Sequence, residues 1–553
     1  LTTDEIRRAK ALSAAAAALW QQHATELARV SKATSDELHV WPDPAPNRAP
    51  TTTAQKDATY QREMLSEQVK NASPYRRLKI AMDAWCALWF WPLDQAAHLP
   101  TREEWWFVLE TVLLGNASLA EVTPSTDFFP ETLPQSTLDF TPERDRYGQV
   151  DIDALVAALP TLRVAQQVAS RQHFFHWELE FADQFKARNG FDLVLGNPPW
   201  IKVEWNEQAL LSDFDPRFAI RRLNAKETAD ERSVVFSAQP IARREYLREG
   251  LTTEGMQAFL NALQNYPMLR GTPANLYKCF LPLIWRIGNG VQCLLHEEGL
   301  YEASNGGALR REVYSRLRAH YQFQNEMKLF PEIGNRRKYS INLFSSKREP
   351  HFKTISNLFH PQTTFSSLEH LGGGETPGIK NGFGDWDTDG HANRVIEVDL
   401  DLLGTFAQLY DEPGTPANEA RLPTVHSREL ISVLKRFSLQ PNHLANIEED
   451  FLLHQIWDEA GAQADSLIHR ETSFAASLED LILSGPHIYI CNPFSKTPKR
   501  VCDTHRAYEP IDLETLPDGY FPRVNYRRGP DLIRYVSRLP RVGWLDDGAV
   551  EQK

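Results

Sequence analysis

The stretch FDLVLGNPPW, from Phe191 to Trp200, constrains the fold of this 553-residue chain more than any other part of it. Its first half is an apolar run that ends at a glycine, which predicts a buried strand of a mostly parallel sheet. Its second half places Asn197 and two prolines where the strand gives way to a loop, and the prolines fix the backbone there. Polar and aromatic groups held at the carboxyl end of a central strand often form a ligand site. The sequence therefore predicts an α/β sheet with a site at this strand end.

Composition narrows the class of protein. A chain of 553 residues with 42% hydrophobic residues indicates two or three globular domains. No apolar run is long enough to cross a bilayer and the start has no signal-peptide pattern, so we expect no membrane contact. Five scattered cysteines favour a reducing cytoplasm. The net charge of -13 argues against indiscriminate coating of nucleic acid, but it leaves room for a local DNA-binding patch.

The pattern of the chain predicts three regions. Residues 1–170 are rich in helix formers and form a mainly helical segment. Residues 171–350 alternate strand and helix patterns, as in an α/β sheet domain. Residues 351–553 begin with a loop rich in glycine and aspartate and end in a segment dense in Arg, Lys, Pro and Tyr, which we interpret as an α+β recognition domain.

The residues after the predicted strand suit one kind of chemistry. The side-chain oxygen of Asn197 and the carbonyl of Pro198 are two acceptors at a fixed separation, and an exocyclic amino group has two hydrogens to donate. Accepting both hydrogens draws the nitrogen towards a geometry with a free lone pair, which can attack an electrophile. Trp200 offers a face on which a base can stack. The alternative is a purely structural turn between a strand and a loop.

The same residues carry a resemblance to a known family. GFDLVLGNPPW resembles the catalytic motif of the gamma-type N6-adenine DNA methyltransferases, and FHWELEFADQF resembles the segment before it in large bacterial restriction-modification and phage-defence methylases of the Eco57I-like, BREX and DISARM types. The resemblance implies a Rossmann-like methyltransferase core, S-adenosylmethionine as cofactor and no metal. It also implies that Asn197, Pro198, Pro199 and Trp200 are catalytic. Glutamine methyltransferases share the short motif, so a protein or RNA substrate remains an alternative.

Two downstream segments extend the resemblance. NLYKCFLPLIW resembles the helix after the catalytic loop, in which Phe280 corresponds to a residue that lies against the adenine of S-adenosylmethionine. MKLFPEIGNRRKYSINLF resembles the last catalytic motif, in which Phe330 matches an aromatic on the other face of an extruded base. Trp200 and Phe330 would then stack on both faces of one flipped adenine. The alternatives are an amphipathic core helix for Phe280 and a core position beside a turn for Phe330.

Two basic segments are candidates for contacting double-stranded DNA. One follows Phe330, and the other lies near the C-terminus, where LSGPHIYICNPFSKTPKRVCDTHRAYEPIDLETLPDGYFPRVNYRRG resembles the target-recognition segment of the same methylases. Positive side chains position the DNA backbone and polar groups can read base edges, although each of these residues could instead be an ordinary surface charge. The candidates are Arg336, Arg337, Lys338, Lys496, Lys499, Arg500, Arg523, Asn525 and Arg527. A zinc site of His487, Cys491, Cys502 and His505 is disfavoured because their spacing fits no standard finger.

One expected part is missing from the sequence. A methyltransferase of this type implies a glycine-rich donor loop after its first strand, and residues 1–190 contain no such loop. Because the chain also starts at Leu1 without a methionine, we expect the N-terminal donor-binding part to lie upstream or in another chain. The resemblance implies site-specific methylation of adenine N6 in restriction-modification or phage defence, with other defence-system subunits as possible partners. The alternative is a non-catalytic DNA-binding specificity subunit.

Overall fold

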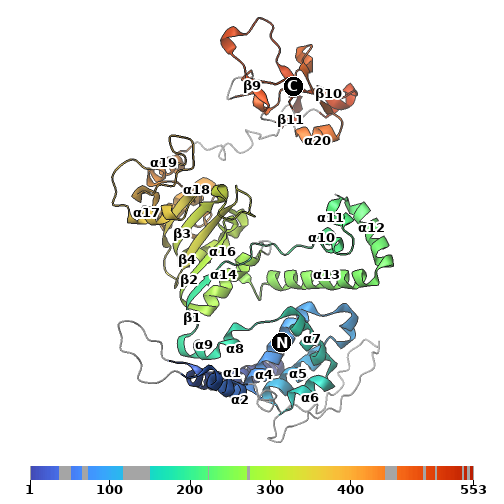
Figure 1. Ribbon diagram of the computed structural model, residues 1–553, viewed down its shortest axis with the longest axis vertical. Coiled ribbons are helices and arrows are strands. Elements are labelled where there is room, and N and C mark those ends of the chain that lie inside the picture. The colour runs from blue at the N-terminus through green and yellow to red at the C-terminus, as the bar shows by residue number, and fades with distance from the viewer. Residues whose placement is uncertain are drawn as a thin grey trace. The chain divides into compact units, whose positions relative to one another are not determined.

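The computed structural model divides the chain into two units, Leu1–Leu439 and Gln440–Lys553 (Figure 1). Each unit is described by itself. The structure describes residues 2–36, 51–64, 73–115, 150–221, 223–270, 275–441, 458–489, 494–502, 504, 507–538, 541–544 and 548–551.

The first unit begins with helices whose ends are set by local capping. Thr2 and Glu5 form a reciprocal capping box at the start of the first helix, and Ser73 caps another helix that has Pro74 in its first turn. The apolar faces of these helices share one core. The helices are α1 (Thr3–Thr34), α2 (Thr53–Met64), α4 (Pro74–Ala87), α5 (Arg102–Leu114), α6 (Ile152–Ala158), α7 (Pro160–Gln172), α8 (Trp177–Glu180) and α9 (Ala182–Arg188), with short 3-10 turns η1 (Leu88–Phe90) and η2 (Leu93–His98).

A six-stranded mixed sheet follows, in the order β1-β2-β4-β3-β5-β6. β1, β2, β3 and β5 run parallel to one another, whereas β4 and β6 are antiparallel to their neighbours. The carboxyl ends of the four parallel strands therefore meet at one edge of the sheet. The strands are β1 (Phe191–Gly196), β2 (Gly288–Glu297), β3 (Leu317–Gln324), β4 (Lys338–Phe344), β5 (His351–Leu358) and β6 (Ile396–Asp399). This sheet with its helices confirms the predicted α/β class.

One face of the sheet is covered by helices. The main core joins α14 (Leu276–Ile287), α16 (Gly307–Arg316) and α18 (Leu400–Tyr410) to side chains of the strands, such as Leu294 and Phe352. Smaller helices complete this part: α15 (Gly299–Glu302), α17 (Gln362–Glu369) and α19 (Arg428–Ser438). Between β1 and α14 the chain makes an arm of α10 (Glu207–Ser212), α11 (Arg217–Ile220), α12 (Ala225–Ala238) and α13 (Pro240–Asn261), which has a small core of its own.

The predicted burial of β1 is wrong. β1 is an edge strand, and within the described residues β2 is its only strand partner. Leu193 is 58% exposed, Leu195 is 68% exposed, and Val291 on the neighbouring β2 is 45% exposed. The apolar run led to a prediction of a central strand because such runs usually belong to strands with neighbours on both sides.

The second unit contains short paired strands. β7 (Ile468–Phe474) pairs with β10 (Arg523–Arg528), β8 (Lys496–Pro498) pairs with β9 (Tyr508–Pro510), and β11 (Arg541–Trp544) pairs with β12 (Gly548–Glu551), all antiparallel. Two short helices accompany them, α20 (Glu459–Ala464) and α21 (Leu532–Ser537). The boundary between the units falls after Leu439 rather than after residue 350, because β5 and β6 belong to the sheet of the first unit.

Candidate functional site

The carboxyl ends of the four parallel strands bring together residues that are distant in the sequence. Asn197 follows β1, Glu298 follows β2, Asn325 follows β3 and Phe359 follows β5. Ligands of open α/β sheets bind at this edge. The predicted catalytic loop and the predicted loop of Phe330 therefore leave the sheet on the same side.

The loop after β1 is fixed at both ends, and the side chain of Asn197 remains accessible. The side chain of Asn197 is exposed, and within the described part of the chain it has no hydrogen-bond partner. Pro198 is buried and Pro199 is exposed. The Trp200 indole Nε1 donates to the carbonyl of Leu295 on β2 at 3.2 Å. The backbone N–H of Leu276 donates to the carbonyl of Ile201 at 3.0 Å, which ties the loop to the start of α14.

The structure brings Trp200 and Phe330 together, but not as two parallel rings. Their ring centroids are 5.8 Å apart and their planes meet at 63°, so they touch edge to face. A base stacked between two parallel rings needs a separation of about 7 Å, that is, two stacking steps of about 3.4 Å. Tyr339 contacts both rings, with centroids 5.7 Å from Trp200 and 5.0 Å from Phe330. The predicted clamp requires these rings to move apart when a base enters.

The loop that carries Phe330 is organised around one buried amide. Asn325 is fully buried, and its Nδ2 donates to the carbonyls of Phe330 at 2.8 Å and Ile333 at 2.9 Å. Its Oδ1 accepts the backbone N–H of Phe330 at 3.0 Å. Asn325 is not among the residues predicted to be functional. An asparagine directly after a strand and before a proline-containing turn is the signal that points to such a role.

The basic residues of this loop differ in their contacts. Arg336 is exposed. Arg337 forms an ion pair with Glu297 at 3.4 Å, and Lys338 forms one with Glu302 at 2.9 Å. All three lie at the start of β4 or just before it, on the edge that carries the candidate site. Phosphate contacts by Arg337 and Lys338 would compete with these exposed pairs, which are weak in water.

Phe280 lies on α14, half-buried against the main core. Two residues before it, Lys278 is buried, and burial lowers the pKa of its ammonium group. No residue of this helix was predicted to titrate abnormally, because burial of a lysine cannot be read from helical spacing.

A buried polar layer joins the end of β2 to the middle of β3 and β5. Nε2 of His320 lies 3.1 Å from a Glu298 oxygen, and its Nδ1 lies 2.8 Å from the Thr354 hydroxyl. Burial by itself raises the pKa of Glu298, but the charge and hydrogen bond of His320 outweigh it and hold the pKa below its usual range. His296 is fully buried, and burial lowers its pKa to about 4. This layer stiffens the strand ends that support the site.

The C-terminal candidates fall into two groups. Lys496, Lys499 and Arg500 are exposed, and their contact with DNA stays a prediction. The side chains of the other three, Arg523, Asn525 and Arg527, form hydrogen bonds within the second unit.

Arg523 donates to the Pro498 carbonyl at 2.8 Å and pairs with Glu509. Arg527 donates to the Ser473 hydroxyl at 2.8 Å. Asn525 is 3% exposed and donates to the Tyr508 hydroxyl at 2.9 Å. These contacts hold β10 to its neighbours, a role that composition alone does not distinguish from DNA contact.

The disfavoured zinc site can be described only in part. Cys491 and His505 lie outside the described residues. His487 is buried, with Nε2 2.9 Å from the Arg523 carbonyl and Nδ1 3.1 Å from the Ser484 hydroxyl. Among the residues that the structure describes, no group of three or more His, Cys, Asp or Glu is placed to hold a metal ion.

The described helices also include none long and apolar enough to cross a membrane.

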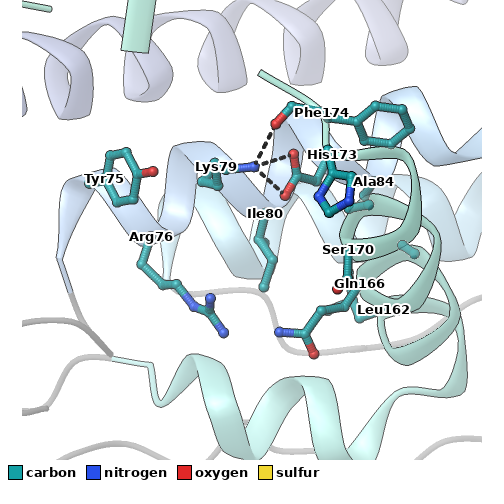
Figure 2. Close-up of a pocket in the computed structure, with 13 residues that line it drawn as sticks. Tyr75, Arg76, Lys79, Ile80, Ala84, Leu162, Gln166, Ser170, His173 and Phe174 are labelled. Carbon is teal, nitrogen blue, oxygen red and sulfur yellow. Dashed lines mark hydrogen bonds and ion pairs between the residues drawn. The ribbon is translucent and has the colours of Figure 1, made fainter. Parts of the chain in front are cut away.

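A cavity of about 400 Å³ between α4 and α7 holds none of the predicted site residues (Figure 2). Within it, Lys79 Nζ contacts both carboxylate oxygens of Asp83 at 2.8 Å and the Phe174 carbonyl at 3.4 Å. His176 also contacts Asp83 at 2.8 Å. The polar groups satisfy one another, so we interpret this cavity as part of the packing of the helical region.

The described residues do not by themselves fit S-adenosylmethionine. The first strand among them is β1, so no described strand with a glycine-rich loop precedes the catalytic loop to hold the methionine and ribose parts. Phe280 remains a candidate for stacking on an adenine ring, but it is a single contact.

Comparison with known proteins identifies a family for one segment. Residues 109–230, less than a quarter of the chain, match the model of the Eco57I restriction-modification methylase family. No curated protein matches the chain. Family similarity therefore rests on a segment that contains β1 and the loop after it.

Several solved structures show weak likeness. The methyltransferase subunit of a type I restriction-modification system from Streptococcus thermophilus is 15% identical, with a TM-score of 0.15, and the match covers 31% of this chain and 27% of that one. A structure of the type I restriction-modification system is 10% identical, with a TM-score of 0.20 and 46% of each chain covered. The ATP-dependent Type ISP restriction-modification enzyme LlaBIII bound to DNA is 9% identical, with a TM-score of 0.17, 35% of this chain and 11% of that one covered.

The matches thus span less than half of each of these solved chains, and TM-scores this low do not establish a shared fold. The segment matched by the family model stands independently of them. Over residues 109–230, the chain is similar to the Eco57I restriction-modification methylases.

Proposed function

We propose that this chain takes part in site-specific methylation of adenine N6 in double-stranded DNA, as part of a restriction-modification or phage-defence system. The observation that carries the proposal is the loop Asn197–Trp200. It leaves the carboxyl end of a parallel strand with its amide side chain exposed and, among the described residues, without a hydrogen-bond partner. It also lies within the segment that matches the methylase family. Assignment to the gamma type, and to an Eco57I-like, BREX or DISARM system, rests on the sequence motifs.

The loop would act by positioning the target amino group. Asn197 Oδ1 and the Pro198 carbonyl accept its two hydrogens, which leaves the nitrogen lone pair free to attack a methyl group. Trp200 supports the plane of the base, and Phe330 closes on its other face after the rings separate. The adenine must leave the duplex, because its amino group is paired there. Catalysis then depends on orientation and exclusion of water more than on a titrating side chain.

We infer that the methyl donor is S-adenosylmethionine and that most of its site is formed by residues other than those described. The open edge of β1 supports this inference, because further parallel strands can pair there beside Asn197. The donor-binding part would belong to the same protein or to a partner subunit. DNA would contact Arg336, Arg337, Lys338, Lys496, Lys499 and Arg500, with Arg523, Asn525 and Arg527 shaping the recognition unit.

The decisive experiment uses Asn197→Ala in the complete gene product. The protein is expressed with its neighbouring genes in a host without adenine methylation, and N6-methyladenine is mapped across the genome. We expect the wild type to methylate one sequence motif and Asn197→Ala to lose methylation by at least about 100-fold, since the amino group loses an acceptor in a water-excluded site. DNA binding, measured by fluorescence anisotropy, should stay within about threefold.

Asn261→Ala on α13 is the matched control, because the side chain of this exposed asparagine donates to the Gln257 carbonyl of its own helix and to no other described residue. It should methylate like the wild type. Retained methylation in Asn197→Ala would remove the catalytic role of the loop.

The described residues do not by themselves form a site for S-adenosylmethionine. This favours a second function, that of a DNA-binding specificity subunit without catalysis. Calorimetric titration of S-adenosylmethionine into this chain and into the complete gene product separates the two. Binding to the complete protein supports the methyltransferase. Sequence-specific DNA binding with no response to S-adenosylmethionine in either protein supports the specificity subunit.

A further inference from the structure

The loop between α17 and the 3-10 turn η6 (Ala392–Arg394) projects a small hairpin. Lys380 and Trp386 pair as an antiparallel bridge, and the N–H of Asp387 donates to the Ile379 carbonyl at 3.1 Å. At its tip stands Phe383, which is 93% exposed. Nearly the whole surface of this ring is therefore accessible to another molecule.

The tip is held in one conformation. Asn381 Oδ1 accepts the backbone N–H groups of Phe383 and Asp385, both at 3.0 Å. Gly384 has a φ of 85°, in the left-handed region that favours glycine, and its N–H donates to the Asn381 carbonyl at 3.0 Å. Lys380 Nζ donates to the Gly384 carbonyl at 2.7 Å. These bonds aim the Phe383 backbone outward instead of letting the side chain fold back.

The base of the hairpin is anchored to the sheet. Trp386 stacks on Phe359, the residue after β5, with centroids 4.6 Å apart. Arg394 is fully buried and donates to the carbonyls of Ser356 at 3.0 Å and Asn357 at 2.9 Å. It also donates to the Asp389 carbonyl at 3.2 Å. A hairpin whose base is held by these contacts can keep its conformation when its tip contacts a ligand.

The hairpin belongs to the same edge as the candidate site, because β5 ends where β1 and β3 end. Met327, three residues before Phe330, lines a cavity of about 740 Å³ together with Gly373, Gly374 and Pro377 of the hairpin loop. Four strand spacings of about 4.8 Å separate the ends of β1 and β5 by about 19 Å. That is the length of about six stacked base pairs.

The apolar side chain at the tip is of the kind that can enter the base stack of a DNA duplex. An apolar side chain can enter between bases, unstack them and bend the DNA. Lys380 and Asp385 carry opposite charges at the tip, while Glu375, Asp387 and Asp389 make the rest of the loop acidic. Entry into a duplex would therefore depend on the apolar ring and not on attraction to phosphates. Asp387, nearer the root, interacts with the buried Arg394, and its charge raises the pKa of that guanidinium while burial lowers it to about 10.

We propose that Phe383 is a wedge that enters the base stack within about six base pairs of the target adenine and, by bending the duplex, assists its extrusion. The inference rests on the proposed function and adds a positioning residue to it. In this arrangement Asn197 and Pro198 hold the extruded amino group, while Phe383 takes part in opening the duplex and does not touch the reacting atoms.

The test compares two duplexes that carry the motif mapped in the genome. One is fully paired, and the other has an abasic site opposite the target adenine, which removes its partner in advance. Methylation rates are measured with the complete gene product for the wild type, Phe383→Ala and Phe383→Trp. We expect Phe383→Ala to slow methylation of the paired duplex by about 10- to 100-fold, since it must open the stack unaided. The abasic duplex should be methylated within about threefold of the wild-type rate, and Phe383→Trp should retain most activity on both.

Phe365→Ala is the matched control, because Phe365 is also an exposed phenylalanine, on the adjoining α17, at 58% exposure. It should change neither rate. An unchanged rate of Phe383→Ala on the paired duplex would overturn the wedge, and so would an equal loss on both duplexes. If the wild type methylates neither duplex, the proposed function fails and the wedge fails with it, a result distinct from a selective failure of Phe383.

Discussion

At the scale of single residues, some polar side chains are exposed to solvent, and others are buried and hydrogen-bonded inside the protein. Asn197 exposes an amide that has no hydrogen-bond partner among the described residues, whereas the amides of Asn325 and Asn525 form internal hydrogen bonds. The sequence could single out Asn197 because its neighbours are diagnostic: an apolar run before it and two prolines after it. It could not separate Asn525 from a DNA-reading residue, because the difference lies in contacts with Tyr508 and Cys502, which are distant in the sequence.

One residue-scale prediction concerns pH. His296 is buried against Tyr277, with ring centroids 5.0 Å apart, and within the described part of the chain its Nε2 has no hydrogen-bond partner. Burial holds its pKa at about 4, below the value near 6.5 in an unfolded chain. The unfolded state therefore binds the proton first, so this residue costs stability as the pH falls from about 6.5 towards 4.

The variant His296→Phe keeps the ring stacking and removes the titration. Urea unfolding at pH 6.5 and pH 5 should show a smaller loss of unfolding free energy than in the wild type. Glu298 contributes little in this range, because its depressed pKa places its titration lower. His360→Gln, a change at an exposed histidine, is the control and should follow the wild type. An identical pH dependence in His296→Phe and wild type would contradict the assignment.

At the scale of elements, local sequence patterns predicted individual strands and loops. Contacts between residues distant in the sequence determined how these elements pair and pack. The strand Phe191–Gly196 and the loop after it were readable because an apolar run followed by prolines acts locally. The position of β1 at the sheet edge was not readable, because it depends on which strands pair with it. The role of Tyr339 was missed for a similar reason: it sits inside a strand pattern, and only the fold brings it to Trp200 and Phe330.

The loop between β3 and β4 gives an element-scale prediction. Asn325→Ala removes three hydrogen bonds that define the loop, to the N–H and carbonyl of Phe330 and to the carbonyl of Ile333. Buried groups left without partners cost about 1–3 kcal/mol each, less what water recovers. We expect the free energy of unfolding in urea to fall by about 2–3 kcal/mol.

The matched control is Asn335→Ala in the same loop, since Asn335 is exposed and, among the described residues, its side chain bonds to Glu326 alone, at 3.1 Å. Its free energy of unfolding should change by less than about 0.5 kcal/mol. Equal stability of both variants would mean that Asn325 does not organise the loop.

At the scale of the whole molecule, the division into two units follows the sheet. The sequence suggested a recognition domain from residue 351, yet β5, β6, α18 and α19 stay with the first unit because they complete its sheet and core. The predicted Rossmann-like methyltransferase core stays a prediction, since the mixed sheet establishes an α/β fold and the family match covers residues 109–230.

The open edge of β1 also governs how the purified chain behaves in solution. A strand with free N–H and carbonyl groups and exposed Leu193 and Leu195 is a template for adding a strand from another molecule. We expect the isolated chain to self-associate with rising concentration, and Leu193→Lys with Leu195→Lys to shift it towards monomer in analytical ultracentrifugation. The control pair Ile241→Lys with Leu247→Lys, each residue 53% exposed on α13, should leave the association unchanged. If the β1 variant aggregates less than the wild type, this strand is the surface through which the chain self-associates. The variant would then provide a monodisperse sample.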